Sequence, residues 1–329
     1  MMSLPDFIKK QIVFVFTIEG EKLSFKNDNL ILTGKDNKIK LQLTCYRVFI
    51  LFIIGEFSLT SGLIQKSHIF AFPIYLMSRT FKVYDKLGSK MEGNVLLRRK
   101  QYNYQGLELA RFVIKNKIRN QCILLERIRV KTDEIRETIV KLKDIICRIN
   151  LFNGELHDLL GLEGNAAKLY FKQHFRELQW NGRKPRVKSD YINAILDIGY
   201  TILFNVVDSL LDVYGFDVYC GVLHKEFYMR KSLTCDLVEP FRVLIDNQTR
   251  KSINLGQFKE EDFVKVNGCY QLDWNQNKKY VLIFSQAIME YKEEIFIYFQ
   301  SYYRAFMKQK TAEEYSEFVY GEFLSDDTT

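Results

Sequence analysis

The sequence predicts an α+β protein in which a small β-rich N-terminal domain is followed by a larger all-α domain. The chain has 329 residues, of which 47% are hydrophobic and only 4 are proline, and this is enough material for two hydrophobic cores. Residues 1–85 contain short runs of β-branched and aromatic side chains, whereas the apolar residues after residue 88 recur at helical spacing. We therefore expect one domain over residues 1–88 and a second over residues 89–329.

The strands of the first domain are predicted by runs rich in Val, Ile, Leu, Phe and Thr. The alternation over residues 38–43 places one face in water and one in a core, and Gly34–Asn37 supplies turn residues before it. The predicted strands are Gln11–Thr17, Asn29–Thr33, Lys38–Cys45 and Val48–Ile54, and the same pattern continues over Phe57–Leu63 and Ile69–Leu76.

The polar, glycine-containing stretch Tyr84–Lys90 is the candidate linker between the two domains. Apolar residues then step along one helical face over residues 107–125 and along another over 132–149, where Thr132 can cap the helix. The later helices are predicted at Glu155–Leu178, at Ser189–Tyr214 with Ser189 as cap and Gly215 as stop, at about Thr234–Asn247, at about Lys279–Lys308, and after Thr311.

The cysteines and the apolar segments indicate a cytoplasmic protein. The six cysteines form no C-x-x-C pair and lie mostly in apolar runs, which is typical of reduced core thiols and argues against a zinc site. We see no secretory signal at the N-terminus. The most apolar run, Val48–Gly55, is much shorter than the roughly 20 residues of a membrane span. We therefore expect a soluble intracellular protein that binds no membrane.

The net charge of +8 is spread unevenly, with the basic excess in the N-terminal half of the chain. Residues 1–90 carry 13 basic and 7 acidic side chains. Residues 91–190 carry 21 basic and 12 acidic side chains, whereas residues 191–329 carry 14 basic and 21 acidic ones. The basic excess could attract a polyanion, although a soluble surface of mildly basic character is the simpler explanation of charge alone.

Three separated segments each place a metal-capable side chain in an apolar frame: Leu160–Ala167 with Glu163, Gly221–His224, and Asp236–Arg242 with Glu239. A helix over the first segment puts Glu163 beside the buried stripe, where a carboxylate is costly unless it is paired or binds a cation. Gly161 and Gly164 would let other backbone come close to it. Each residue taken alone has an ordinary explanation, as a solvated glutamate, a buried histidine or a charge at a helix end.

Together these segments resemble the CRISPR-associated protein one family, the integrase/endonuclease of spacer acquisition. Members show a Gly-x-Glu-Gly-x-x-Ala stretch, a Gly-x-x-His loop and an Asp-Leu-x-Glu/Asp-x-Phe-Arg helix in this order. Glu239 stands where some members carry Asp. The resemblance covers about 95–300, and its further matches are Arg98–Gln101, Leu109–Arg111, Asn193–Leu196, Gly199–Tyr200 and Glu261–Phe263.

The resemblance implies that the helical domain is catalytic and inserts short foreign DNA fragments into a CRISPR array, by attack of a DNA 3′-hydroxyl on a repeat phosphodiester. It assigns Glu163, His224 and Glu239 as ligands of Mg²⁺ or Mn²⁺, with Asp236 as a fourth catalytic residue that either binds the metal or supports a ligand. The alternative is a DNA-binding scaffold of the same ancestry without catalysis. His68, His157 and His174 match nothing and are expected to be structural.

A mobile basic connector at residues 180–188 is suited to binding backbone phosphates without reading bases, although it could also be only a solvated loop. Its candidate DNA-binding residues are Arg183, Lys184, Arg186 and Lys188, and we add Lys225 and Arg242 near the proposed ligands. Arg230 and Lys231 could also position a strand.

The expected partners are DNA, in the form of the prespacer and the CRISPR repeat, and a second copy of the chain. Two strand joinings are needed to insert a spacer, yet one chain holds one ligand set, so at least two copies must act together. The β-rich domain, with strand edges and apolar runs such as Val48–Ile54, is the expected dimerisation surface. The resemblance adds a small ferredoxin-like CRISPR-associated protein that bridges two dimers, in the cytoplasm of a prokaryote.

Overall fold

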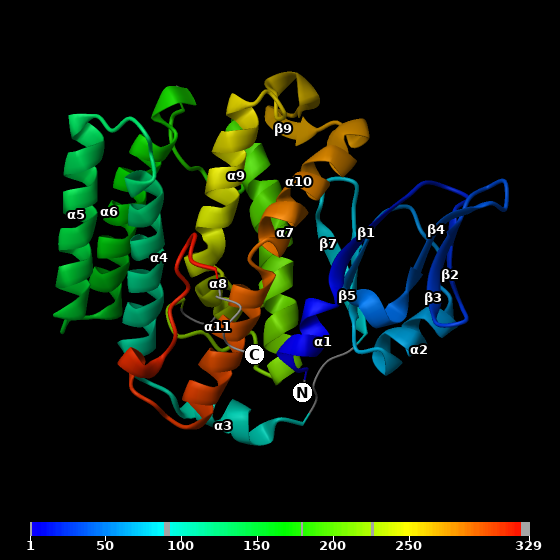
Figure 1. Ribbon diagram of the computed structural model, residues 1–329, viewed down its shortest axis with the longest axis horizontal. Helices are drawn as coiled ribbons and strands as arrows, with labels where there is room; N and C mark the ends of the chain where they lie inside the picture. Colours follow the sequence, from blue (N-terminus) through cyan, green and yellow to red (C-terminus); the bar gives the residue numbers. More distant parts are fainter. Residues whose placement is uncertain (1, 89–92, 179, 225–226, 324–329) are drawn as a thin grey trace.

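The computed structural model describes residues 2–88, 93–178, 180–224 and 227–323. A strand-rich N-terminal part is followed by a mostly helical part, as Figure 1 shows. The predicted α+β class is therefore confirmed.

Two sheets form the N-terminal part. Strands β1, β5 and β6 run parallel and β7 closes the first sheet antiparallel, in the order β1-β5-β6-β7, while β2-β3-β4 form an antiparallel sheet. The strands of these sheets are β1 (Gln11–Thr17), β2 (Lys22–Lys26), β3 (Asn29–Thr33), β4 (Ile39–Thr44), β5 (Val48–Gly55), β6 (Pro73–Met77) and β7 (Val83–Gly88).

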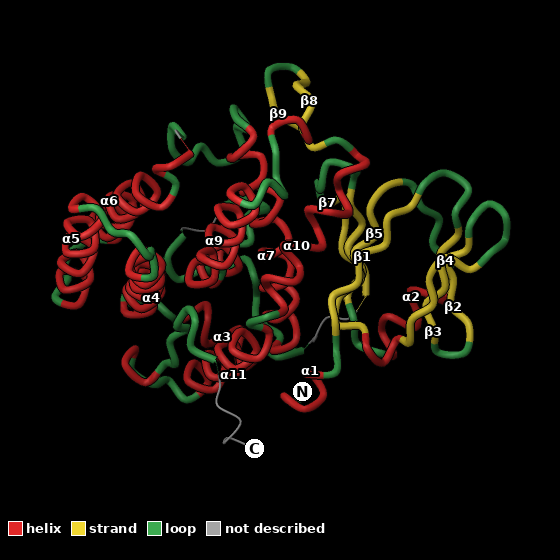
Figure 2. The backbone as a smooth tube through the Cα atoms, turned by 45° about the horizontal axis from the view of Figure 1, so that its top comes forward, coloured by secondary structure: helices red, strands yellow, loops and turns green. Residues whose placement is uncertain are grey.

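The four-stranded sheet lies between the three-stranded sheet and the helices (Figures 1 and 2). Along β5, Leu51 and Ile53 belong to the core under the three-stranded sheet, and Phe52 and Ile54 belong to the core shared with the helices. Burial on both faces explains the unbroken apolar run of this strand. Val48–Ile54 is therefore a central strand, and the expectation that it forms a dimerisation surface is wrong.

Two further expectations for the N-terminal part are corrected. Helix α2 (Ser61–Ile69) replaces the strand expected at Phe57–Leu63, because Thr60 caps it by accepting a hydrogen bond from the Leu63 amide. The stretch taken for a linker is mostly β7, which pairs with β6 through Gly88. Residues 89–92 lie outside the described part of the chain.

The helical part holds the remaining elements, which begin with α3 beyond residue 93. A short helix, α1 (Leu4–Ile8), precedes the first strand and packs against α11. The other helices are α3 (Val95–Asn103), α4 (Glu108–Glu126), α5 (Asp133–Asn150), α6 (Leu156–His174), α7 (Tyr191–Tyr214), α8 (Ser232–Leu237), α9 (Arg242–Asn254), α10 (Asn277–Met289) and α11 (Lys292–Met307).

Helix α7 is the centre of the helical part and contacts α8, α9, α10 and α11. The side chain of Asp190, not that of Ser189, caps it by accepting from the Asn193 amide, and Gly215 ends it at φ 79°. This helix is long and apolar enough to cross a membrane, but 83% of its apolar window is buried inside the protein, as in the core helix of a soluble protein.

Two expected helices are divided, and one hairpin was not expected. The segment predicted as one helix over Thr234–Asn247 consists of α8, a 3-10 turn at Glu239–Phe241 that contains Pro240, and α9. The segment predicted over Lys279–Lys308 consists of α10 and α11. Between α9 and α10, strands β8 (Phe263–Val266) and β9 (Cys269–Leu272) pair antiparallel.

Candidate active site

Glu163 lies on α6 and faces Lys117, which reaches it from α4. The Lys117 ammonium contacts Glu163 Oε1 and lies 2.6 Å from Glu239 Oε2, so one cation pairs with both carboxylates. A Cβ built on Gly161 or Gly164 meets nothing within 4 Å. The expectation that other backbone packs closely against these glycines is therefore wrong, and this face of α6 is open.

Glu239 opens the 3-10 turn between α8 and α9 and is 5% exposed. Burial alone would raise the pKa of Glu239, but the nearby Arg242 and Lys117 cations hold that pKa below its ordinary value. Arg242 Nη2 lies 3.1 Å from Glu239 Oε1. Although burial opposes the charged form, Glu239 and Glu163 raise the pKa of Lys117. The cluster is therefore a set of fixed charges in a largely buried place.

His224 is held by Asp236, whose carboxylate is fully buried on α8. Asp236 Oδ1 accepts from the His224 backbone amide at 2.9 Å and lies 2.6 Å from His224 Nδ1. Its Oδ2 accepts from the amides of Val222 and Leu223 at 2.6 and 3.0 Å. A carboxylate only accepts hydrogen bonds, so Nδ1 donates to Asp236 and Nε2 is the ring nitrogen left to face away from Asp236.

This geometry bears on the two roles left open for Asp236. Both of its oxygens are engaged by the loop that carries His224, and the helix break at Pro240 separates it from Glu239. The arrangement favours Asp236 as the residue that orients a ligand over Asp236 as a ligand itself.

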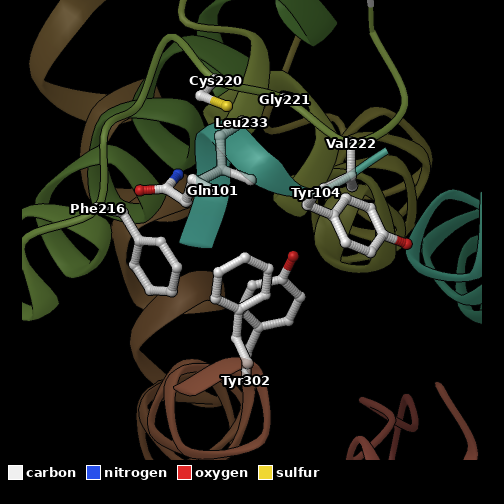
Figure 3. Close-up of a pocket in the computed structure, with 9 residues that line it drawn as sticks. Gln101, Tyr104, Phe216, Cys220, Gly221, Val222, Leu233 and Tyr302 are labelled. Atoms are coloured by element: carbon white, nitrogen blue, oxygen red, sulfur yellow. The ribbon is translucent and has the colours of Figure 1, made fainter. Parts of the chain in front are cut away.

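The loop before His224 packs against α8 so closely that Gly221 has no room for a side chain. A Cβ there would lie 2.7 Å from Ser232 Cβ and 2.9 Å from the His224 carbonyl oxygen. On the inner side of the loop, Gly221 and Val222 line a small pocket with Gln101 of α3 and Tyr302 of α11 (Figure 3). The Gln101 side chain exchanges two hydrogen bonds with the backbone of Asp217, which fixes the start of the loop.

The carboxylate and imidazole side chains are of the types that bind a hard divalent cation, although the described residues are not already arranged around one. Within the described residues, no group of three or more His, Cys, Asp or Glu side chains is arranged to hold a metal ion. The Oε2 atom of Glu239 is buried and makes no directed hydrogen bond, although Lys117 lies beside it. Two carboxylates that converge on one cation, together with the His224 imidazole, which helps to lower the pKa of Glu239, fit Mg²⁺ or Mn²⁺ if the Lys117 ammonium moves aside.

The basic side chains of the connector at residues 180–188 differ in their surroundings. Arg183 is directed inward, because its guanidinium pairs with Asp197 and donates to Asn193 Oδ1 at 2.9 Å. The Asn193 side chain also accepts from the Lys184 amide, and the Tyr270 amide donates to the Lys188 carbonyl at 3.0 Å. The connector is therefore anchored to α7 and β9 by these hydrogen bonds.

The other basic candidates are placed as follows. The side chains of Lys184 and Arg186 are exposed and that of Lys188 is half-buried. Arg242 is bound to Glu239 and stacks over the Tyr200 ring at 4.8 Å, so it belongs to the charge cluster. Lys225 lies outside the described residues.

Lys117 was missed by the sequence reasoning. It sits on α4 between Val113, Ile114 and Gln121, which are all buried, and a lysine flanked by buried residues at helical spacing is the signal that could have identified it. An unpaired ammonium would be costly there, which predicts a carboxylate partner.

Comparisons with known proteins agree with this architecture. The family model described as CRISPR associated protein Cas1 matches residues 14–286. A CRISPR-associated endonuclease Cas1 of Archaeoglobus fulgidus is 30% identical over 254 residues, which cover 69% of this chain and 74% of that protein.

Two solved structures share the fold at lower identity. A chain of a Cas6-RT-Cas1–Cas2 complex has a TM-score of 0.79 at 20% identity and covers 95% of this chain, which spans 36% of that longer chain. A casposase bound to its integration product has a TM-score of 0.76 at 19% identity and covers 97% of each chain. Since the family model spans well over half of the sequence, the chain belongs to the CRISPR associated protein Cas1 family.

Proposed function

We propose that this protein is a metal-dependent DNA integrase/endonuclease that inserts spacers into a CRISPR array, by attack of a DNA 3′-hydroxyl on a repeat phosphodiester. Its relatives include proteins named as CRISPR-associated endonucleases, and the casposase of similar fold is described as bound to an integration product. The observation that carries the proposal is the convergence of Glu163 and Glu239 on one cation, together with the Asp236–His224 pair, whose imidazole helps to lower the pKa of Glu239.

Glu163, Glu239 and His224 Nε2 would hold Mg²⁺ or Mn²⁺, which when bound polarises a phosphoryl oxygen and offsets the charge on the leaving oxygen. The remaining roles belong to the chain itself. Asp236 holds the imidazole in one tautomer and one orientation through its bond to Nδ1. Arg242 holds the Glu239 carboxylate through Oε1, and Lys117 balances both carboxylates.

A DNA-binding scaffold without catalysis remains the second candidate, and one observation favours it. Lys117 pairs with both carboxylates and Arg242 pairs with Glu239, so Glu163 and Glu239 have structural partners that would justify their presence. The geometry of His224 favours catalysis. Both carboxylate oxygens of Asp236 hold His224 and its loop in one position, and a scaffold would have no need to orient this imidazole.

The partners and location are proposed with the function. We propose that the protein binds prespacer and repeat DNA, forms a homodimer, and joins a ferredoxin-like CRISPR-associated protein in the cytoplasm of a prokaryote. One structural relative is named as a Cas1–Cas2 assembly, which supports a protein partner of this kind. We also propose that residues 1–88 serve assembly and that residues 89–329 carry the reaction.

The deciding experiment is nicking of branched or plasmid DNA with Mn²⁺ or Mg²⁺, compared with a chelator. We expect cleavage by the wild type, and losses of about 100-fold or more in Glu163→Gln and His224→Ala with the fold intact, because each removes a proposed metal ligand. His157→Ala is the matched control, since His157 is exposed on α6. Wild-type protein that is inactive with every divalent metal would establish the scaffold.

A further inference from the structure

Another buried carboxylate, that of Asp208 on α7, joins the strand-rich part to the proposed reaction centre. It is fully buried and lies outside the proposed ligand set. Its Oδ2 accepts from the Tyr75 hydroxyl of β6 at 2.7 Å and lies 2.8 Å from Lys86 Nζ of β7. The same oxygen lies 2.9 Å from Lys231 Nζ, just before α8.

Both carboxylate oxygens of Asp208 have hydrogen-bond or ion-pair partners, as a buried polar cluster must have to be stable. Burial favours the neutral acid, yet Lys86 and Lys231 keep the pKa of Asp208 below its ordinary value. Burial raises the pKa of Tyr75 well above its ordinary value, with Asp208 adding to the effect, so the hydroxyl keeps its proton for donation. Asp208 Oδ1 receives a further bond of 3.3 Å from the Thr234 hydroxyl of α8.

Helix α8 carries this contact to the imidazole. Lys231 precedes its first turn, Thr234 lies in that turn, and Asp236, in its second turn, holds the backbone amide and ring of His224. A helix of this length is one rigid unit of less than two turns. A shift at the Asp208 end is therefore transmitted to His224, and the Gly221 contact with Ser232 allows the loop little freedom to compensate.

We propose that Asp208 is a positioning residue that couples the packing of the four-stranded sheet against α7 to the orientation of His224. A partner or second copy that moves β6 or β7 then changes the reaction centre, although neither strand contributes a residue to it. This inference rests on the proposed function for its catalytic consequence, but its structural part stands without it.

The test uses Tyr75→Phe, which removes the link from β6 and leaves both lysines on Asp208. The matched control is Tyr298→Phe, because Tyr298 is also buried and its hydroxyl makes no hydrogen bond to the described residues. Asp208→Asn should have the larger effect, because it changes every contact of the carboxylate. If Asp208→Asn fails to fold, the conservative Tyr75→Phe still tests the proposal.

Two readouts need neither metal nor DNA. The chain has only four histidines, so the ring nitrogens of His224 can be assigned by NMR with His224→Gln as reference. We expect Tyr75→Phe to reduce the Nδ1–H tautomer and to speed amide exchange in residues 218–224 and 232–237 by about fivefold, which is the effect of losing one net hydrogen bond. Tyr298→Phe should change neither.

A third readout is DNA nicking, where Tyr75→Phe should lower kcat and leave KM unchanged. The proposal would be overturned if both Tyr75→Phe and Asp208→Asn kept the wild-type His224 tautomer and the wild-type amide exchange rates. The network would then have a purely structural role. An inactive wild type would overturn the proposed function alone, since the NMR and exchange results would still decide the coupling.

Discussion

Lys117 places one positive charge between two carboxylates that would otherwise repel each other. Its side chain is 10% exposed, and that of Glu239 is 7% exposed. Removing one partner of a buried pair leaves the other charge uncompensated, which typically costs about 3–5 kcal/mol. In Lys117→Met we therefore expect the metal-free protein to lose stability of this order, as measured by urea unfolding.

The same variant should respond more strongly to metal. A bound cation would replace the lost ammonium, so Mn²⁺ should raise the Tm of Lys117→Met more than that of the wild type. Lys115→Met is the control, because Lys115 lies on the same helix but pairs with Glu317 at 3.2 Å, away from the site. Equal Tm shifts in all three proteins would show that Lys117 does not occupy the cation position.

Asp246 gives the stability a pH dependence of its own. It is buried on α9 and accepts from the hydroxyls of Tyr170 and Tyr200. Burial raises its pKa from 3.8 to about 6, although the two tyrosines and nearby Arg242 oppose this. At a pH between these two pKa values, Asp246 is ionised in the unfolded chain and keeps its proton in the folded chain. The free energy of unfolding therefore falls as the pH rises from about 4 to 6.

Asp246→Asn should remove this loss, because the amide is never ionised. The difference in unfolding free energy between variant and wild type should shift in favour of the variant by roughly 3 kcal/mol from pH 4 to pH 7. Asp144→Asn, an exposed control on α5, should give a flat difference. A flat difference for Asp246→Asn as well would mean that Asp246 titrates normally.

At the scale of elements, periodicity predicted the strands β1, β3, β4 and β5 and the helices α4 to α7 to within a few residues. These elements are long or strongly patterned, so local preference and tertiary packing agree. Pro240 is a signal in the sequence for a helix break, because proline inside a helix removes a hydrogen bond. Proline is also common in the first turn of a helix, so Pro240 alone does not predict where one helix ends and the next begins. That break decides the site, because it turns Asp236 and Glu239 toward different partners.

The site was predictable as a set of residue types and not as a geometry. Glu163, Glu239 and His224 are predicted from their segments, whereas the Lys117 bridge joins α4 to α6 and the 3-10 turn across long sequence separations. Arg183 illustrates the opposite error. Its position in a basic connector predicted a phosphate contact, but Asp197 and Asn193, one helical turn apart on α7, bind its guanidinium.

The DNA contact of the connector is therefore predicted for Lys184, Arg186 and Lys188 alone. Changing these three residues to Gln should weaken DNA binding uniformly across sequences and reduce the log–log salt slope by roughly 0.9 for each phosphate that the variant no longer neutralises. Arg183 is left unchanged because its loss would disturb α7. The control is the same change at Lys22, Lys26 and Lys35, which are exposed in the strand-rich part, and equal slopes in both triple variants would remove the connector from the DNA interface.

At the scale of the whole molecule, the buried position of β5 changes how a dimer can be tested. Phe7 stacks on Phe296 of α11, and the core shared with the helices includes Phe49, Phe52 and Tyr75. Deleting residues 1–85 would therefore expose the helical core, and a loss of association could not be separated from unfolding. The test must use surface residues that the monomer does not need.

Two exposed apolar side chains near each other in the strand-rich part meet this condition. Tyr46 is 64% exposed and packs edge-on against Phe70, which directly follows Ile69, itself 66% exposed. Exposed apolar patches mark association surfaces, and two-fold symmetry would bring this patch onto its own copy. We expect light scattering to give twice the monomer mass of 39.0 kDa for the wild type at micromolar concentration.

The double variant Tyr46→Asp with Ile69→Asp should return that mass to one monomer, because two buried carboxylates facing their own copies are strongly unfavourable. Leu151→Asp is the matched control, since Leu151 is 86% exposed and follows directly after α5, a helix on the opposite side of the helical part from the sheets (Figure 1). A dimer that survives in the double variant would place the interface elsewhere. A wild type that is already monomeric would instead require the protein or DNA partner to bring two reaction centres together, because the described residues of one chain form one proposed centre.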